Sequence, residues 1–263
     1  MATPQTEFAL HFEAEGSGLP LLLIHGFPLG SRMWAGQLES LSNRAHVLAP
    51  DLPGFGDSPI SGLSYTVERY AEDCAAVLDA LDVLEPVALG GLSMGGYIAL
   101  AFARLFPERV GALLLLSTRA GADSAEGKAN RDKAIAGVKE HGASAATEAI
   151  FPKLLASATY THNPGIATQA AELMLAASPE GIIAALGAMR DRPDSTASLS
   201  KIEVPTLIVH GKQDQLIPPS EAEVMSAAIK GSQLHLIDNA GHLPNLEQPE
   251  GFNRIISGFL QSL

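Results

Sequence analysis

The sequence predicts an α/β fold in which a mostly parallel sheet carries helices on both faces and a helical cap insertion. Several short apolar runs, such as residues 21–24, have the composition of strands buried on both faces. These runs alternate along the chain with segments of helical length, which is typical of parallel sheets. One long segment, residues 119–198, has no strand pattern and interrupts the alternation.

Each element is predicted from its local pattern. The weak alternation of residues 8–13 predicts an antiparallel edge hairpin with the residues that follow, with a turn at 16–18. Apolar runs predict buried strands at residues 21–24, 47–49, 87–89, 110–116, 206–210 and 234–237. Amphipathic or Ala-rich segments predict a short helix starting at Ser31 and helices over residues 66–81, 97–106, 219–230 and 250–260.

Residues 119–198 are predicted to form the cap, and residues 1–118 together with 199–263 the core that contains the sheet. An insertion after a strand is expected to cover the carboxyl edge of the sheet, where open α/β sheets bind their ligands. Its large apolar residues either build the core of the cap or line a pocket, and we favour the cap core for each: Phe151, Leu154, Leu155, Tyr160, Met174 and Met189.

Composition limits the partners of the chain. A net charge of −12 without a basic cluster argues against nucleic acid and against an anionic membrane surface. Cys74 is the only cysteine, so no disulfide forms within the chain, which fits a reducing compartment. Residues 1–15 lack the pattern of a signal peptide, and no apolar run has membrane-spanning length. We therefore expect a cytoplasmic enzyme with neither a nucleic-acid nor a membrane partner.

Gly91-Leu92-Ser93-Met94-Gly95 is a G-x-S-x-G motif between a predicted strand and a predicted helix. A serine on such a sharp turn has a strained backbone, and the two glycines leave room for the chain to fold back. The turn places Ser93 at a helix N-terminus, where free N–H groups favour a developing negative charge. The alternative is a Gly-rich turn with an unreactive serine, but the flanking strand and helix favour a nucleophile.

A serine nucleophile needs a base and a group that orients the base. Asp214 and His242 each follow a predicted strand, so their side chains are expected at the same sheet edge as Ser93. His210, at a strand end, is the one serious rival base. No His and Asp residues cluster with zinc-ligand spacing, so we expect no metal and no cofactor.

The order Ser, Asp, His is that of α/β-hydrolases, and the sequence resembles serine hydrolases of this fold with a helical cap. It is similar to the branch of 3-oxoadipate enol-lactonases and carboxylesterases, from His25-Gly26-Phe27-Pro28 to Asn245-Leu246-Glu247-Gln248-Pro249, with the cap its least distinctive part. The resemblance implies hydrolysis of a small-molecule ester or lactone through an acyl-enzyme. Haloalkane dehalogenases and epoxide hydrolases of this fold use Asp at the position of Ser93, which sets them apart.

The resemblance also implies an oxyanion hole made by the backbone N–H groups of Phe27 and Met94. His25 and Asp51 are then expected to position loops, and Gly26 to give the backbone room to turn. Arg119 either binds an acidic substrate or pairs with a cap carboxylate such as Asp123, and we favour the pairing. The expected pocket residues are Gly26, Trp34, Arg119, Phe151, Tyr160, Met174, Met189, Ile217 and Leu243.

Other functions remain open at this point. An enol-lactonase or a C–C bond hydrolase of aromatic catabolism uses the same triad, and a cofactor-free perhydrolase replaces water by peroxide. A ligand-binding receptor of this fold retains the triad without turnover. We favour a general esterase or lactonase. The sequence leaves open the acyl group, the leaving group and the oligomeric state, a homo-oligomer included.

Overall fold

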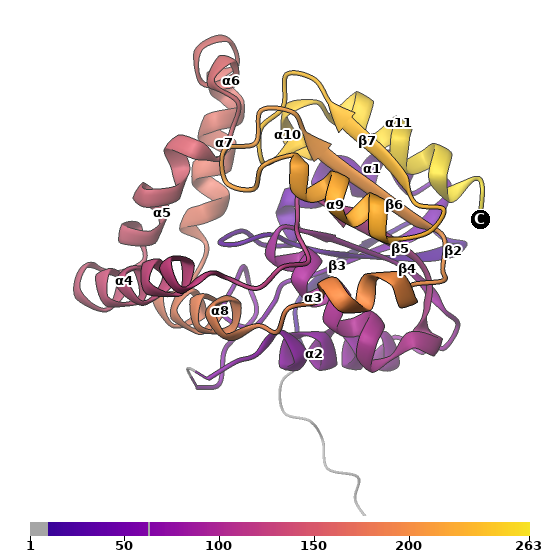
Figure 1. The fold of residues 1–263 in the computed structure, drawn as a ribbon, viewed down its shortest axis with the longest axis horizontal. Helices are drawn as coiled ribbons and strands as arrows, with labels where there is room; N and C mark the ends of the chain where they lie inside the picture. Colours follow the sequence, from indigo (N-terminus) through magenta and orange to yellow (C-terminus); the bar gives the residue numbers. More distant parts are fainter. Residues whose placement is uncertain (1–9, 63) are drawn as a thin grey trace, which may run out of the picture.

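The computed structural model describes residues 10–62 and 64–263, and these form a seven-stranded sheet with helices around it (Figure 1). The strands lie in the order β1-β3-β2-β4-β5-β6-β7, and all neighbours are parallel except β1 and β3. This confirms the mostly parallel sheet. The strands span Phe12–Glu15 (β1), Leu19–Ile24 (β2), Ala45–Pro50 (β3), Val87–Leu92 (β4), Val110–Leu116 (β5), Thr206–Gly211 (β6) and Gln233–Ile237 (β7).

The hairpin predicted for the first strand is wrong. β1 pairs antiparallel with β3, with Phe12 opposite Pro50, and not with β2, the next strand in the chain. β2 is largely buried and pairs with β3 and β4, so it leaves no free edge for β1. β1 itself is half exposed, which suits the edge of a sheet. Residues 8 and 9 of the predicted strand lie outside the described residues.

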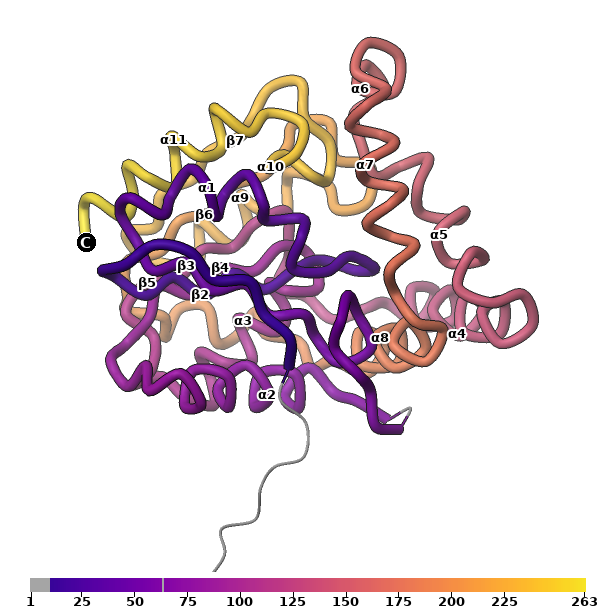
Figure 2. The backbone as a smooth tube through the Cα atoms, turned by 180° about the vertical axis from the view of Figure 1, so that it is seen from behind, coloured from indigo at the N-terminus to yellow at the C-terminus, as the bar shows by residue number. Residues whose placement is uncertain are grey.

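Helices cover both faces of the sheet, as the alternation predicts. Leu22 and Ile24 of β2 join the apolar cluster of α2, α3 and α9, whereas Leu21 and Leu23 join the cluster of α1 and α11. Figures 1 and 2 show α1 and α11 on one side of the sheet and α2 and α3 on the other. These helices and the short α10 span Ala35–Leu41 (α1), Val67–Ala80 (α2), Met94–Leu105 (α3), Ser220–Ala228 (α9), Pro244–Glu247 (α10) and Pro249–Leu260 (α11).

The fully described segment between β5 and β6 is helical, and we keep the term cap for residues 119–198. Its α-helices gather at the end of the molecule opposite the C-terminus (Figures 1 and 2). α4 packs on α8, and α6 packs on α7. The cap helices span Ala125–His141 (α4), Ser144–Ile150 (α5), Ser157–His162 (α6), Pro164–Leu175 (α7) and Pro179–Asp191 (α8). The division of the chain into a core and a cap domain stays a prediction.

A sharp bend separates α7 from α8. Ser178 caps α8, because its Oγ accepts a hydrogen bond from Gly181 N at 3.0 Å, and Pro179 occupies the first turn. The axes of the two helices differ in direction by 94°. Within the described part of the chain, no single helix has both the length and the apolar composition to cross a membrane. In the same described residues, this bent pair is the only one that meets the two criteria when its helices are taken together.

Candidate active site

The serine of the G-x-S-x-G motif lies on a sharp turn between β4 and α3. Ser93 has a φ of +56°, a left-handed conformation that non-glycine residues rarely adopt. Its N–H donates to Leu116 O at 2.9 Å and its carbonyl accepts from Thr118 Oγ1 at 2.8 Å, so the end of β5 holds the turn. A Cβ on Gly91 would overlap the backbone of Gly95, and a Cβ on Gly95 would overlap the backbone of β2. The chain therefore forms the strained turn that its glycines predict.

Asp214 and His242 follow β6 and β7, and the structure brings their side chains together. His242 Nδ1 lies 2.7 Å from Asp214 Oδ2, and both side chains are buried. The other oxygen, Asp214 Oδ1, accepts hydrogen bonds from the N–H groups of Leu216 and Ile217 at 2.8 and 3.0 Å. With Nδ1 donating to Asp214, the Nε2 of a neutral His242 is an acceptor.

The surroundings of Asp214 keep its carboxylate ionised. Burial by itself favours the protonated carboxyl, but the nearby His242 and the hydrogen bonds from His210, His242 and Ile217 outweigh burial and hold the pKa of Asp214 well below its usual range. An ionised carboxylate stabilises a cationic imidazole beside it. The pair is thus suited to a histidine that gains and loses a proton.

Ser93 and His242 line the same cavity, which has a volume of about 140 Å³. An apolar cavity of about 150 Å³ holds a benzene-sized ligand, so this space accommodates a small acyl group. Ser93 and His242 reach it from β4 and β7, and Asp214 stands behind His242. We call this space the catalytic cavity, and its other lining residues are Phe27, Tyr97, Arg119, Arg131, Ile150, Met189, Leu216 and Ile217.

Two backbone N–H groups at this sheet edge are free to donate. Phe27 follows β2 and lines the catalytic cavity, and Met94 is the first residue of α3, where an N–H has no acceptor within the helix. Neither N–H donates to a residue in the described part of the chain. The adjacent His25 is fully buried, with Nδ1 3.0 Å from Gly26 O and Nε2 3.0 Å from Leu52 N. Burial lowers the pKa of His25, so a neutral imidazole joins the two loops.

His210, the rival base, has a different position. It is fully buried, and its Nε2 lies 2.9 Å from Ile217 O and 3.1 Å from Asp214 Oδ2. It does not line the catalytic cavity, whereas His242 does. The geometry therefore favours His242 as the base and gives His210 a place behind the carboxylate.

Only part of the expected pocket lines the catalytic cavity. Trp34 is fully buried and stacks on Phe252 of α11, with ring centroids 6.5 Å apart. Phe151 and Tyr160 pack edge to face within the cap, 5.5 Å apart. Each of these side chains has a neighbour of its own, which keeps it away from the cavity. The expected residues that line it are Arg119, Met189 and Ile217, and those that do not are Gly26, Trp34, Phe151, Tyr160, Met174 and Leu243.

The other three expected pocket residues that do not line the cavity are also packed against the protein. Met174 and Leu243 are fully buried in the apolar cluster that includes α1 and α11. Gly26 is buried against Leu92, at the end of β4. The cavity residues that sequence reasoning missed are Tyr97, Arg131, Ile150 and Leu216. The sequence contains one indication that Arg131 lies near Asp123. Arg131 carries the opposite charge and follows Asp123 by eight residues in a segment that is predicted to be helical.

The sequence pattern of the alpha/beta hydrolase fold family matches residues 20–249. The chain belongs to this family. It is 32% identical over 258 residues to the 2-hydroxy-6-oxo-2,4-heptadienoate hydrolase of Pseudomonas putida. This alignment covers 93% of this chain and 90% of that protein. A solved structure of a thermophilic esterase from Thermogutta terrifontis, with malate bound, has a TM-score of 0.95 and 41% identity, over 99% of this chain and 96% of that one. The enol-lactonase from Burkholderia xenovorans has a TM-score of 0.88 and 25% identity, over 96% of each chain.

These relatives confirm the resemblance to the enol-lactonase and esterase branch of the α/β-hydrolases, and their names support a hydrolase activity. The names include a hydrolase of a dienoate as well as an esterase and a lactonase. The family therefore shows the fold, the names of the relatives support a hydrolase, and the bond that this α/β-hydrolase cleaves is treated below as a proposal.

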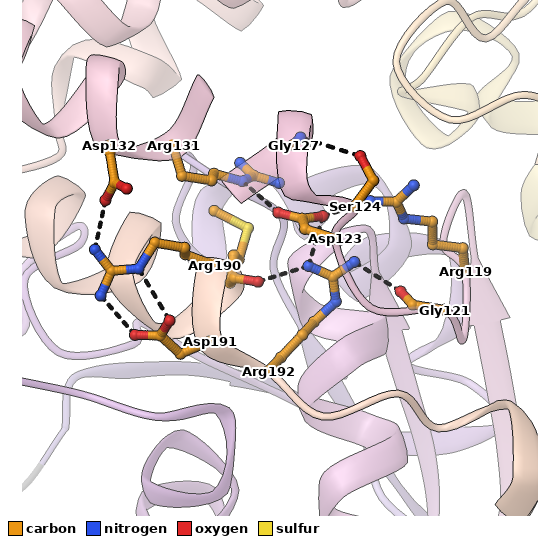
Figure 3. A network of polar contacts seen from close by, with 11 residues as sticks. Arg119, Gly121, Asp123, Ser124, Gly127, Arg131, Asp132, Arg190, Asp191 and Arg192 are labelled. Carbon is orange, nitrogen blue, oxygen red and sulfur yellow. Dashed lines mark hydrogen bonds and ion pairs between the residues drawn. The ribbon is translucent and has the colours of Figure 1, made fainter. Parts of the chain in front are cut away.

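In this α/β-hydrolase, the expected pairing of Arg119 with Asp123 is present, and it belongs to a larger cluster (Figure 3). Asp123 Oδ1 accepts from Arg119 Nη2 at 2.5 Å and from Arg192 Nη1 at 2.9 Å, and Oδ2 accepts from Arg131 Nε at 3.1 Å. Burial opposes the ionised carboxyl, but Arg131 and Arg192 outweigh burial and lower the pKa of Asp123. Three cations share one anion here, at the entry to the cap.

Among the described residues, one group of three His or acidic side chains has the spacing to hold a metal ion. His11, Asp51 and Asp57 place one potential ligand atom each within 4.8 Å of one another. Asp51, however, already accepts hydrogen bonds from Ser31 N and Asp57 N, and lies 2.8 Å from His11 Nδ1. These bonds fasten the loop after β3, which agrees with the structural role expected for Asp51. None of the three residues lines the catalytic cavity.

Proposed function

We propose that this α/β-hydrolase cleaves carboxylic esters or lactones with Ser93 as nucleophile, His242 as base and Asp214 as the group that orients the base. The observation that carries the proposal is that Ser93 and His242 line one cavity while Asp214 holds His242 Nδ1 at 2.7 Å. The serine is on a strained turn, the imidazole has a free acceptor nitrogen, and the carboxylate is ionised. These are the three properties that a serine nucleophile requires.

In the first half of the proposed reaction, Ser93 Oγ attacks the carbonyl carbon while His242 Nε2 accepts the hydroxyl proton. The tetrahedral intermediate collapses, the bond to the leaving oxygen breaks, and His242 returns the proton to that oxygen. The products are an alcohol (for a lactone, a hydroxyl still attached to the acyl group) and an ester of Ser93. Asp214 stabilises the transient imidazolium and stays ionised.

In the second half, water attacks the acyl-enzyme and His242 takes one of its protons. Collapse of the second intermediate releases the carboxylic acid and returns the proton to Ser93. The N–H groups of Phe27 and Met94 are proposed to stabilise the oxyanion of both intermediates. A preorganised donor of this kind contributes roughly 3 kcal/mol in enzymes where it has been removed.

The experiment that tests the proposal compares wild type with Ser93→Ala on 4-nitrophenyl esters, lactones and an enol-lactone, together with labelling by a fluorophosphonate. Ser93→Ala is expected to lose several orders of magnitude in kcat and all labelling. Ser117→Ala is the matched control, since Ser117 follows β5, has a φ of +41° and does not line the cavity. Ordinary ester turnover by Ser93→Ala contradicts the mechanism. If the wild type neither hydrolyses any of these esters and lactones nor reacts with the fluorophosphonate, the proposed enzyme activity is contradicted. A ligand-binding receptor then remains.

Hydrolysis of a C–C bond is the second candidate, favoured by the 32% identity to the hydrolase of a heptadienoate. The same three residues would serve, so mutation of Ser93 does not separate the two reactions. A vinylogous 1,5-diketone, assayed beside the ester panel, separates them through the ratio of kcat/KM values. We favour the ester because the relative with the higher identity, 41%, is described as an esterase.

A further inference from the structure

A second cavity lies in the cap beside the catalytic cavity. It has a volume of about 300 Å³, and we call it the cap cavity. Its walls come from the entry of the cap and from α4, α5 and α8. It shares Arg119, Arg131 and Ile150 with the catalytic cavity, so these three side chains stand between the two spaces.

The boundary between the two cavities carries an excess of positive charge. The guanidinium groups of Arg119, Arg131 and Arg192 all contact the single carboxylate of Asp123. Over residues 10–62 and 64–263, no other carboxylate lies within 4.0 Å of their nitrogens. Three guanidinium groups against this one contacting carboxylate leave an excess of positive charge beside the two cavities.

The three arginines are not equivalent. Arg192 is 2% exposed, donates to Met189 O, Gly121 O and Asp123, and stacks 4.0 Å from the centre of the Tyr97 ring. Its contacts are all within the protein, and it lines neither of the two cavities. Arg192 therefore fastens the cap segment.

Arg131 has N–H donors that no acceptor among the described residues uses. Its side chain is 23% exposed and lines both cavities, and only Nε is engaged, by Asp123. Its two terminal nitrogens donate to no acceptor in the described part of the chain. Arg119 also lines both cavities. It donates Nη2 to Asp123 and lies close to the Tyr97 hydroxyl, while its buried Nε has no hydrogen-bond partner among the described residues. A planar guanidinium with free donors matches a carboxylate better than any neutral group.

We propose that the cap cavity binds a carboxylate carried by the substrate, held by Arg131 and Arg119, while the scissile carbonyl lies at Ser93. This inference rests on the proposed ester hydrolysis and names its substrate class: esters or lactones that carry a negative charge. A neutral ester or lactone would leave the terminal donors of Arg131 without an acceptor.

Two pairs of esters test this, and they also tell which side of the ester carries the charge. The acyl pair is mono(4-nitrophenyl) adipate and 4-nitrophenyl 6-methylheptanoate, in which an isopropyl group replaces the carboxylate. The alcohol pair is 6-(butanoyloxy)hexanoate and hexyl butanoate. The wild type is expected to prefer the charged member of at least one pair by tenfold or more in kcat/KM. No preference in either pair overturns the proposal.

Variants locate the site. Arg131→Gln is expected to lower kcat/KM for the charged ester, mainly through KM, at least tenfold more than it lowers kcat/KM for the neutral ester. The matched control is Arg190→Gln, which removes an arginine of the same cap that pairs with Asp132 and Asp191 and lines neither cavity. Equal losses on both esters, or the same effect from Arg190→Gln, overturn the proposal.

A second variant leaves every ion pair intact. Ala134 lines the cap cavity one turn after Arg131 on α4. Ala134→Glu is expected to abolish the preference for the charged ester, since it supplies a carboxylate in place of the substrate, whereas Ala134→Gln, of equal size, is expected to retain most of it. An unchanged preference in Ala134→Glu overturns the proposal even where Arg131→Gln fails to fold.

Binding without turnover separates this inference from the proposed function. Calorimetry of adipate with Ser93→Ala is expected to show binding that weakens at least tenfold when Arg131→Gln is added. If esters are not hydrolysed but adipate binding depends on Arg131, the proposed function fails and the anion site stands. If esters are hydrolysed and adipate binds equally well without Arg131, the proposed function stands and the anion site fails.

Discussion

Two buried aspartates stand at the centres of the two working regions of this molecule. Asp214, at the carboxyl edge of the sheet, has two imidazoles and two backbone N–H groups as partners. Asp123, at the entry to the cap, has three guanidinium groups. In both cases burial opposes ionisation, and the partners outweigh it and lower the pKa of the carboxyl.

The partners make the difference between the two regions. An imidazole gains and loses a proton near neutral pH, whereas a guanidinium stays charged in proteins. The sheet edge can therefore exchange protons with a substrate, and the entry to the cap holds a fixed positive charge. The same residue type supports chemistry in one region and, by our proposal, recognition in the other.

Neutralising each aspartate in turn gives the sharpest test of this contrast. Asp214→Asn is expected to lower kcat by about 10⁴-fold, as in serine proteases, because an amide favours the wrong tautomer of His242. Asp123→Asn is expected to change kcat for a neutral ester by less than tenfold, since among the described residues only arginines hydrogen-bond to the Asp123 carboxylate and it does not line the catalytic cavity. Steady-state kinetics of both variants, with circular dichroism to check the fold, decide the matter. A comparable loss of kcat in both variants contradicts the difference in role between Asp214 and Asp123.

The next largest effect is on stability. Asp123→Ala is expected to lower the free energy of unfolding by about 3 kcal/mol, because Arg192 is then buried without a counter-charge. Urea unfolding measures it. Asp132→Ala serves as the control: it removes a 58% exposed partner of Arg190 and is expected to cost under about 1 kcal/mol. If the two variants unfold at the same urea concentration, Asp123 does not hold the cap segment together.

Acid should weaken the fold through both aspartates. A carboxyl whose folded pKa is lowered contributes stability above its unfolded pKa of about 3.9, and this is lost as the pH falls towards the folded value. Below about pH 4, each such group lowers the free energy of unfolding by at most about 1.4 kcal/mol for each unit that the pH falls. Unfolding curves between pH 2 and 6 are expected to fall less steeply for Asp214→Asn and for Asp123→Asn than for the wild type. Parallel curves for wild type and variants contradict the lowered pKa values.

The smallest effect is expected from the second histidine at the sheet edge. His210→Gln removes one of several hydrogen bonds to Asp214, a net change of about 1 kcal/mol, so kcat should fall by less than about tenfold. His242→Gln should fall by several orders of magnitude. The paired kinetics distinguish the two histidines, and the reverse order would make His210 the base.

Much of the sheet edge is predictable from the sequence alone, for a topological reason. Parallel strands all present their carboxyl ends at one edge, so residues that follow different buried strands converge whatever the details of packing. Ser93, Asp214 and His242 each follow such a strand, and a run of apolar residues identifies a buried strand without knowledge of its neighbours. The strained turn at Ser93 is equally local, because Gly91 and Gly95 flank it in the chain.

Other features were decided only by the tertiary structure, because they depend on which residue each side chain or strand packs against. Nothing local distinguishes β3 from β2 as the partner of β1, or Phe252 from a substrate as the neighbour of Trp34. Glu247 links the sheet edge to the cap, since it accepts from Gly241 N beside His242 and from Ala156 N, which lies 91 residues away in the sequence. Large apolar and charged side chains gain free energy from whichever complementary group packing brings near. Their roles are therefore set by the folded chain.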